Sequence, residues 1–328
     1  MIRIRTGSRL HFGLFSLPWA QPTSWLNQEG QATLPRRQFG GVGLMIAKPG
    51  IELTVEHAKM WSASGPLAAR ALEFAQSFCK TACVGDSFQV TIESAAPEHA
   101  GLGTGTQLGL AVARAIAELA VLRHRWSNLE IASVLCRARR SAIGVHGFTA
   151  GGLIVEGGKI SDDAISPLLV RQDFPEDWHV MLVTPPNLKG THGFGETGAF
   201  ADLATRERDD DTTNALCRLV LLGILPAIFD EDLTTFGEAL YDFNRRVGEM
   251  FQTVQGGIYA HPRIEEIIRI LRLAGVKGVA QSSWGPTIVA IVPSHETVSV
   301  RDWLIRKGIA SEEIVITSAC NQGAEVDK

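Results

Sequence analysis

The sequence lacks the features that direct a chain to nucleic acid or to a membrane. Its 328 residues carry a formal net charge of −4, and no stretch interleaves basic with aromatic residues, so we expect no nucleic-acid partner. The longest apolar run, 219–229, contains Pro226 and is too short to span a bilayer. Residues 1–5 alternate as a strand does and do not resemble a signal peptide. These absences predict a soluble, cytoplasmic protein with no membrane partner.

Cysteine is sparse and forms no metal-binding pattern. The five cysteines are scattered, and the closest pair, Cys79 and Cys83, has no second pair of cysteine or histidine nearby at zinc-ligand spacing. We therefore expect buried thiols in a reducing compartment. Glu118, Glu156 and Glu196 are candidate metal ligands, but no spacing selects any of them, so the metal ligands stay unknown.

The chain contains enough apolar sequence to bury a core. With 45% hydrophobic residues, it is long enough for one large or two ordinary domains. Residues 1–176 mix strands with helices, the latter expected at 67–79, 107–123 and 128–140. The elements of 177–328 follow the order β-α-β-β-α-β with an extra helix, which is typical of a ferredoxin-like arrangement. The sequence thus predicts an α+β protein with two domains.

A long aperiodic segment, 19–39, interrupts the first domain. Such a segment in a compact domain is either a functional lid or disordered. Its two tryptophans favour docking of at least part of it.

The most informative segment is 97–107, which lies between an expected strand at 88–93 and a buried helix. Glycines allow a backbone to approach a ligand closely, and the start of a helix offers unpaired N–H groups at its positive end, a combination that favours phosphate or pyrophosphate. No lysine follows the last glycine, and the glycine spacing is not the dinucleotide fingerprint. The candidate anion ligands are Gly101, Gly103, Thr104, Gly105, Thr106 and Gln107.

Two further segments carry candidate catalytic residues. Alternation places Arg9 and His11 on one face of a strand, where they could hold phosphate or carboxylate or could simply face solvent. A glycine-rich turn at 139–152 carries Arg140, Ser141 and His146. Its arginines could bind substrate or complement the end of the preceding helix, and His146 could be catalytic or an ordinary loop histidine.

The connection at 281–287 holds two serines and a tryptophan that a simple turn does not need. Serine hydroxyls and exposed N–H groups there could form a second anion-binding concavity, with the tryptophan as an apolar wall. The candidate substrate-binding residues are Gln281, Ser282, Ser283 and Trp284.

Together these segments resemble one family. Pro97, Gly101, Leu102 and Gly103 match the second motif of the GHMP kinase superfamily, Pro-x-x-x-Gly-Leu-Gly-Ser-Ser-Ala, whereas Gly105 and Thr106 depart from it. Within that superfamily the chain resembles the β-ribofuranosylaminobenzene 5′-phosphate synthases, and the similarity covers nearly the whole chain. The segments that carry it are 9–12, 40–44, 99–107, 140–152 and 281–287.

The resemblance implies both a fold and a reaction. The fold is GHMP kinase-like, with an N-terminal ribosomal-protein-S5-like domain and a C-terminal ferredoxin-like domain. The reaction is the condensation of phosphoribosyl pyrophosphate with 4-aminobenzoate, releasing CO₂ and pyrophosphate, in methanopterin biosynthesis. It implies Mg²⁺ as cofactor and a homodimer. The 101–106 loop would hold the leaving pyrophosphate, but which basic residue binds which anion stays open, as does a hydroxybenzoate acceptor.

Two alternatives remain at this point. A small-molecule kinase of the superfamily would carry a catalytic Asp where this chain has Gly144, and no Asp occurs between Asp86 and Asp162. A catalytically degenerate member would bind nucleotide or pyrophosphate without turnover.

Overall fold

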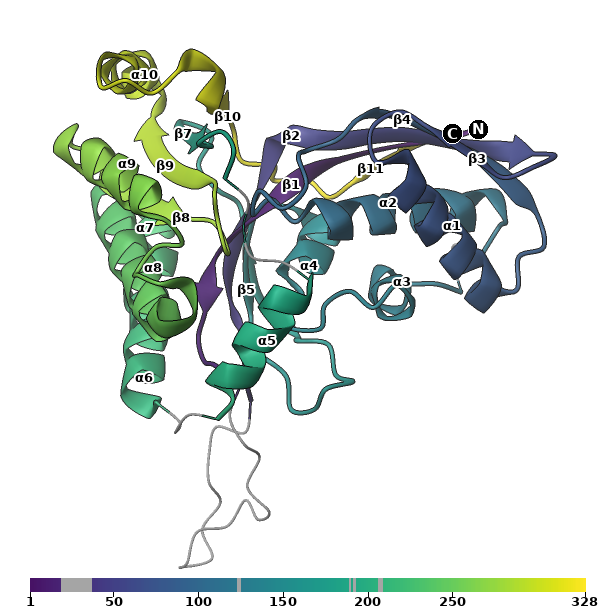
Figure 1. Cartoon of the computed structure of the whole chain (residues 1–328), viewed down its shortest axis with the longest axis horizontal. Helices are drawn as coiled ribbons and strands as arrows, with labels where there is room; N and C mark the ends of the chain where they lie inside the picture. The colour runs from purple at the N-terminus through teal and green to yellow at the C-terminus, as the bar shows by residue number, and fades with distance from the viewer. Residues whose placement is uncertain (19–36, 123–124, 189, 191–192, 206–208) are drawn as a thin grey trace, which may run out of the picture.

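A computed structural model describes the chain except for residues 19–36, 123–124, 189, 191–192 and 206–208. The described part contains two β-sheets with helices packed against them, and α5 lies between the two halves (Figure 1). The predicted lid at 19–39 lies largely outside the described residues.

The first sheet has the strand order β11-β1-β2-β4-β3, and β5 joins it by pairing with β2 and β6. Helices α1 and α2 pack on one face and enclose an apolar core with it. The strands are β1 (Ile2–Leu14), β2 (Gly41–Ala58), β3 (Ser62–Ser64), β4 (Ser87–Ser94), β5 (Leu153–Glu156), β6 (Leu168–Gln172) and β11 (Glu325–Asp327). The helices are α1 (Ala68–Ala82), α2 (Thr104–Leu119), α3 (Asn128–Val134) and α4 (Ile143–Ala150).

The second sheet has the order β10-β7-β9-β8, with every neighbouring pair antiparallel. This order confirms the predicted ferredoxin-like arrangement. The strands are β7 (Trp178–Val183), β8 (Gly278–Gln281), β9 (Ile288–Pro293) and β10 (Ile314–Thr317). The helices are α5 (Gly193–Leu203), α6 (Asp210–Leu219), α7 (Leu225–Phe229), α8 (Leu233–Gln255), α9 (Pro262–Leu273) and α10 (Thr297–Arg306), with short helical turns at Val220–Ile224, Ser294–Glu296 and Ser311–Glu313.

One apolar cluster joins the two halves. Leu10 and Phe12 of β1 pack in the same cluster as Phe236 and Phe243 of α8. All four side chains are fully buried. The residues expected at the core-facing side of this strand are therefore buried against the second domain. β1 is one continuous strand rather than the two expected at 1–5 and 10–16, and bulges between Thr6 and Ser8 and between His11 and Gly13 change the direction of its side chains.

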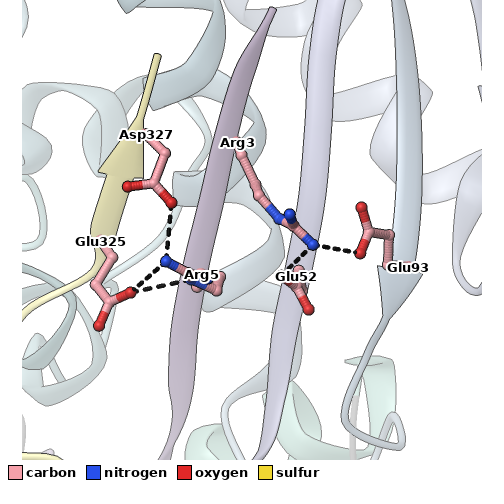
Figure 2. A network of polar contacts seen from close by, with 6 residues as sticks. All are labelled: Arg3, Arg5, Glu52, Glu93, Glu325 and Asp327. Atoms are coloured by element: carbon pink, nitrogen blue, oxygen red, sulfur yellow. Dashed lines mark hydrogen bonds and ion pairs between the residues drawn. The ribbon is translucent and has the colours of Figure 1, made fainter.

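The end of the chain belongs to the first sheet, which differs from the predicted second domain of 177–328. The N–H of Cys320 donates to Met45 O, and β11 pairs antiparallel with β1, so both termini lie side by side (Figure 1). Figure 2 shows the ion pairs that flank this edge of the sheet. Arg5 contacts Glu325 and Asp327 on β11, and Arg3 contacts Glu52 and Glu93 on β2 and β4.

Two helix predictions were wrong at their ends, and two helices were missed. The helix expected at 128–140 ends at Val134, and the predicted glycine-rich turn at 139–152 contains α4. The helix expected from Gln107 begins at Thr104, because Gly103 in the left-handed region caps it (φ +70°). Helix α5 was not predicted.

The apolar run 219–229 lies in the second half of a helix, which agrees within two residues with the helix that the sequence predicts at 212–229. Residues 210–229 form one continuous helical segment with a wide turn at Val220–Ile224, just before Pro226, whose ring removes a backbone donor. By length and composition alone this segment could cross a membrane. Leu216, Val220 and Ile224 on one face of the segment are buried in the cluster that includes α8, whereas Leu221, Leu222 and Phe229 are exposed.

Candidate active site

A cavity of about 550 Å³ lies where the two domains meet. It is lined by β1, the loop before α2 and the segment before α4 from the first domain, and by α5, α8 and the β8–β9 connection from the second. The cavity therefore brings together four of the segments that the sequence singled out.

Arg9 lies in this cavity beside the glycine-rich loop. Its N–H donates to Leu102 O at 2.9 Å, and a Cβ placed on Gly103 would lie 3.1 Å from Arg9 Nε, so the guanidinium packs against the loop. Its Nε and Nη1 atoms are buried and have no hydrogen-bond partner within the described residues. Burial lowers the pKa of Arg9 to about 10, which leaves it charged at neutral pH. Glu156 and Glu196 act on this charge from nearby but accept no hydrogen bond from Nε or Nη1. Two buried guanidinium N–H groups without an acceptor are costly, which favours an anionic ligand.

The glycine-rich loop ends directly in the first turn of α2. The first N–H groups of a helix have no carbonyl partner within the helix and lie at the positive end of its dipole. Thr104 Oγ1 donates to Pro97 O at 2.9 Å, which fixes the loop from within. The predicted anion ligands that line the cavity are Gly101, Gly103, Thr104, Gly105 and Thr106.

Gln107 does not fit its predicted role as an anion ligand. It is fully buried, its Oε1 accepts a hydrogen bond from Thr6 Oγ1 and its Nε2 donates to Gly144 O, both at 2.8 Å. Because α2 starts three residues earlier than expected, this side chain points inward and joins α2 to β1 and α4.

His11 lines the cavity next to Arg9. Its side chain is buried, and its Nε2 atom has no hydrogen-bond partner in the described part of the chain. Burial, with the nearby positive charge of Arg9, holds the pKa of His11 well below its ordinary value. His11 is thus a neutral imidazole that can donate or accept one hydrogen bond to a ligand.

The structure contradicts a catalytic role for His146. This residue lies within α4, is not among the cavity-lining residues, and its Nε2 lies 2.8 Å from Ser166 O. Burial lowers the pKa of His146, so it is a neutral, structural histidine. The alternative interpretation, an ordinary histidine with a satisfied hydrogen bond, was the correct one.

Arg140 and Ser141 both line the cavity, as predicted for substrate-binding residues. Arg140 Nη1 lies 2.7 Å from Glu196 Oε1, and its guanidinium carbon lies 4.4 Å from the centre of the Phe200 ring. Because α3 ends at Val134, Arg140 is too far along the chain to complement the end of that helix. It is instead fixed at the cavity wall by a carboxylate and a ring.

The β8–β9 connection divides into two kinds of residue. Gln281, Ser283 and Trp284 line the cavity, whereas Ser282 is fully buried behind it. Ser282 Oγ donates to Gly101 O at 2.7 Å and accepts the N–H of His11 at 3.1 Å. Ser282 is therefore not a substrate ligand, and its role is to hold the glycine-rich loop and β1 together.

Asn244 on α8 supports the same junction and was missed in the sequence. Its Nδ2 donates to Phe12 O at 2.7 Å and to Gln281 O at 3.0 Å, and its Oδ1 accepts the N–H of Gln281. A polar residue between the buried Phe243 and Val247 was the available signal, since a buried amide must be hydrogen-bonded.

The cavity lining carries more positive than negative charge. Two carboxylates are present, Glu98 paired with Arg70 and Glu196 paired with Arg140. Arg137 adds a buried Nε without a hydrogen-bond partner among the described residues. The lining arginines are Arg9, Arg70, Arg137, Arg139 and Arg140. Aromatic rings line the same cavity: Phe12, Phe200, Phe251, Tyr259 and Trp284.

Comparison with known proteins identifies the family. The models of the GHMP kinase N-terminal domain and the GHMP kinase C-terminal domain match residues 67–152 and 224–300. A protein from Archaeoglobus fulgidus, named beta-ribofuranosylphenol 5′-phosphate synthase, is 33% identical over 100% of both chains. The chain belongs to this synthase family. A protein of the same name from Methanothermobacter thermautotrophicus is 28% identical and covers 98% of this chain and 97% of its own.

Solved structures agree with the GHMP fold of the synthase. A mevalonate diphosphate decarboxylase from Staphylococcus aureus superposes with a TM-score of 0.63 at 15% identity, covering 100% of this chain and 99% of that one. A homoserine kinase from Cytophaga hutchinsonii gives a TM-score of 0.66 at 13% identity, covering 99% and 97%. The predicted α+β, two-domain GHMP kinase-like fold is confirmed, and the chain is an enzyme, as its synthase relatives are.

Gly144 stands where a kinase of the superfamily would carry its catalytic base, and it packs closely against the first turn of α2. A Cβ at this position would lie 3.3 Å from Thr106 Cγ2 and 3.4 Å from Gln107 Nε2, so a larger side chain there would require small shifts in that turn. No aspartate is present among the described residues that line the cavity.

No group of three or more metal-ligating side chains occurs among the residues that the structure describes. Of the three candidate metal ligands, Glu118 lies near Lys328 and Glu156 is fully buried outside the cavity lining. Only Glu196 lines the cavity, and it is paired with Arg140. A metal ion in this synthase would therefore need most of its ligands from a substrate.

Proposed function

We propose that this chain joins phosphoribosyl pyrophosphate to a para-substituted benzoate, with release of CO₂ and pyrophosphate. The observation that carries the proposal is the buried, unpartnered guanidinium of Arg9, packed against Gly103 in a cavity with five arginines and an aromatic wall. The synthase family supports the product class, because its curated relatives are named for a ribofuranosylphenol 5′-phosphate.

The donor matches the cationic side of the cavity. Phosphoribosyl pyrophosphate carries anionic groups at both ends of the ribose, and bidentate guanidinium contacts suit such groups. The N-terminus of α2 together with Arg9 is suited to the pyrophosphate, because no side chain caps this helix and Arg9 Nε and Nη1 have no hydrogen-bond partner within the described residues. Arg70 lies against Gly105 of the loop and is paired with Glu98, so the arginines left for the 5′-phosphate are Arg137 and Arg139.

Departure of pyrophosphate leaves positive charge at C1 of the ribose. Catalysis is then mainly positioning of the acceptor and stabilisation of the leaving group, for which fixed donors in a water-poor site are effective. The ring carbon that bears the carboxylate forms the new bond to C1, and pyrophosphate leaves with the C1–O electron pair. Cleavage of the bond to CO₂ returns an electron pair to the ring and restores aromaticity. The sequence of steps balances without an enzyme nucleophile.

Magnesium enters the proposal as a partner of the pyrophosphate. Mg²⁺ in such sites is held by one or two carboxylates and by substrate phosphates. Glu98 is the cavity carboxylate on the loop side, and this sparse donor set fits an ion held mainly by substrate. When bound, the ion would neutralise charge on the leaving group. The proposed Mg²⁺ ion requires no Cys, His or Asp ligand from the protein.

The acceptor is either 4-hydroxybenzoate or 4-aminobenzoate. The relatives' names specify a phenol, whereas the resemblance in sequence motifs implied an aminobenzene. Both acceptors donate electrons through the ring from the para position, so both satisfy the same chemistry. We favour 4-hydroxybenzoate because the named relatives cover this chain from end to end.

The deciding experiment is release of labelled CO₂ from carboxyl-labelled 4-hydroxybenzoate and, separately, 4-aminobenzoate. Each is incubated with phosphoribosyl pyrophosphate and Mg²⁺, and with a control that omits the donor. Donor-dependent release with a riboside product of the expected mass supports the proposal, and its rate with each acid gives the preference. Folded protein that releases no CO₂ with either acid would refute it.

The cytoplasmic location and the homodimer also belong to this proposal. The first is expected from the composition and the second from the family resemblance, and light scattering at micromolar concentration tests the second. A monomer that retains full activity would contradict it.

A further inference from the structure

We propose that Glu196 recognises the para substituent of the aromatic acceptor and that Phe200, Phe251 and Trp284 surround its ring. This inference rests on the proposed function and adds to it the residue that would select the acceptor. It gives a binding role to a residue that the sequence offered only as a metal ligand.

The three rings form a compact cluster on the cavity wall. The centres of Phe251 and Trp284 lie 5.0 Å apart, and those of Phe200 and Trp284 lie 5.9 Å apart, both pairs in edge-to-face contact. Phe200 and Phe251 also contact each other at 5.7 Å. Edge-to-face packing suits aromatic rings, and a further ring can pack against the side of this cluster that lines the cavity. The cluster is therefore suited to a benzoate rather than to a sugar phosphate.

Glu196 is held at the edge of this cluster by two donors. Arg140 Nη1 lies 2.7 Å from its Oε1, and Trp284 Nε1 donates to the same oxygen at 3.3 Å. The guanidinium of Arg140 also stacks on Phe200, so the carboxylate is fixed relative to both rings. Both donors use Oε1, which leaves Oε2 able to accept a hydrogen bond from a ligand.

The chemistry sets the direction of the acceptor. Its carboxylate-bearing carbon must face C1 of the ribose, near the pyrophosphate at Arg9 and the glycine-rich loop. The para substituent then lies on the side of the acceptor ring opposite the bond-forming carbon. A para hydroxyl or amino group is a hydrogen-bond donor, and Glu196 is the cavity carboxylate that contacts the aromatic cluster, through Trp284 Nε1.

The contact would strengthen during the reaction. As the ring carbon attacks C1, positive charge spreads to the para oxygen or nitrogen, which makes its hydrogen a stronger donor to a carboxylate. An interaction that is stronger in the transition state than in the ground state raises kcat. The hydrogen stays on the para group throughout, and the electron pair released when CO₂ leaves removes the positive charge, so no proton is gained or lost.

The binding test uses calorimetry with 4-hydroxybenzoate and with unsubstituted benzoate, and it needs no turnover. The wild-type protein should prefer 4-hydroxybenzoate, and Glu196→Gln should lose about tenfold of that preference, since a charged acceptor makes a stronger hydrogen bond than a neutral one. Phe200→Leu should weaken both ligands by similar factors. Glu98→Gln, the matched change at the other cavity carboxylate, should leave the preference unchanged and weaken pyrophosphate instead.

The kinetic test separates this role from a metal role. Glu196→Gln should lower kcat/KM for the acceptor about tenfold or more and change the KM for phosphoribosyl pyrophosphate by less than about twofold. A raised Mg²⁺ requirement with an unchanged acceptor preference would assign Glu196 to the metal and overturn the proposal. Tyr259 also lines the cavity, so loss of the preference in Tyr259→Phe rather than in Glu196→Gln would overturn it as well.

The two proposals fail in different ways. If the wild-type protein binds 4-hydroxybenzoate with the expected preference but releases no CO₂, the proposed reaction is wrong and the aromatic subsite stands. If it releases CO₂ and Glu196→Gln retains the wild-type preference, the reaction stands and the role of Glu196 is wrong.

Discussion

Ser282 Oγ donates a 2.7 Å hydrogen bond to the carbonyl oxygen of Gly101, which lies 181 residues earlier in the chain. Ser282 Oγ also accepts a hydrogen bond from the N–H of His11, and the N–H of Ser283 donates to His11 O at 2.8 Å. The glycine-rich loop, β1 and the β8–β9 connection are thus joined at one hydroxyl. The glycine-rich loop of the first domain is therefore positioned by the second domain.

We expect Ser282→Ala to lower both stability and donor binding. The change leaves Gly101 O and His11 N–H buried without their partner, which should lower the free energy of unfolding by about 1–3 kcal/mol. The glycine-rich loop should also shift relative to the Arg9 guanidinium, so the KM for phosphoribosyl pyrophosphate should rise more than the KM for the acceptor. Urea unfolding and initial rates measure both effects. Ser283→Ala, which keeps its main-chain bond to His11, is the control, and an equal loss of stability in both variants would contradict the assignment.

Much of the fold was predictable because it depends on local patterns. Alternation predicted strands such as β4 within one residue of each end, and the element order predicted the second sheet. The predicted second domain, 177–328, wrongly included the last residues, which belong to the first sheet. β11 pairs with β1, and local sequence patterns do not predict a contact between the two ends of a chain. Helix α4 was missed since its glycines, Gly144 and Gly147, are typical of a turn and are tolerated here by close packing against α2 and β2.

The site was predicted as a set of segments but not as individual roles. Arg9, Gly103 and Trp284 line the cavity as expected, whereas Gln107 and Ser282 have the right chemistry and lie behind it. Which side chains of a turn face a ligand depends on where the next helix begins. Because α2 begins at Thr104, three residues before the predicted start, Gln107 points into the core instead of the cavity. Other residues line the cavity only because of tertiary packing, and no spacing in the sequence predicts that they do. Examples are Arg70, Arg137, Phe200, Asn244 and Phe251.

Arg9→Ala should remove activity without lowering stability. Loss of a fixed charge at the leaving group should reduce kcat/KM for phosphoribosyl pyrophosphate by about 100- to 1,000-fold. The unfolding free energy should stay the same or rise, because the variant no longer buries a cation that has no partner among the described residues. Calorimetry with pyrophosphate and thermal unfolding test the two parts. Unchanged pyrophosphate affinity would place Arg9 outside the donor site.

Gly103→Val should abolish pyrophosphate binding. Gly103 has φ +70°, where a β-branched residue is strained, and its Cβ would lie 3.1 Å from Arg9 Nε. The substitution should therefore displace the guanidinium and close the approach to the first turn of α2. Pyrophosphate affinity by calorimetry is the measurement. Gly85→Ala, at a position where a Cβ meets nothing within 4 Å, is the control for an added side chain, and equal affinities in both variants would refute the role of the loop.

Glu156 should make the stability of the protein depend on pH. This carboxyl group is fully buried beside the start of α4, where Ala142 N–H donates to its Oε2 at 2.6 Å, and burial raises its pKa to about 7 against the lowering effect of its hydrogen bonds. Between about pH 4.5 and pH 7 the unfolded chain loses this proton and the folded protein keeps it. The unfolded state therefore binds fewer protons, and stability falls as pH rises through this window, by roughly 3 kcal/mol in all.

Glu156→Gln keeps an acceptor for Ala142 N–H and removes the ionisable group. The free energy of unfolding of the variant, relative to that of the wild-type protein, should increase from pH 5 to pH 8. At pH 8 the variant should be the more stable of the two. Urea unfolding at both pH values is the measurement. Parallel stability curves would show that Glu156 is already ionised in the folded protein at pH 5, in which case the positive charge of Arg9 outweighs burial in setting its pKa.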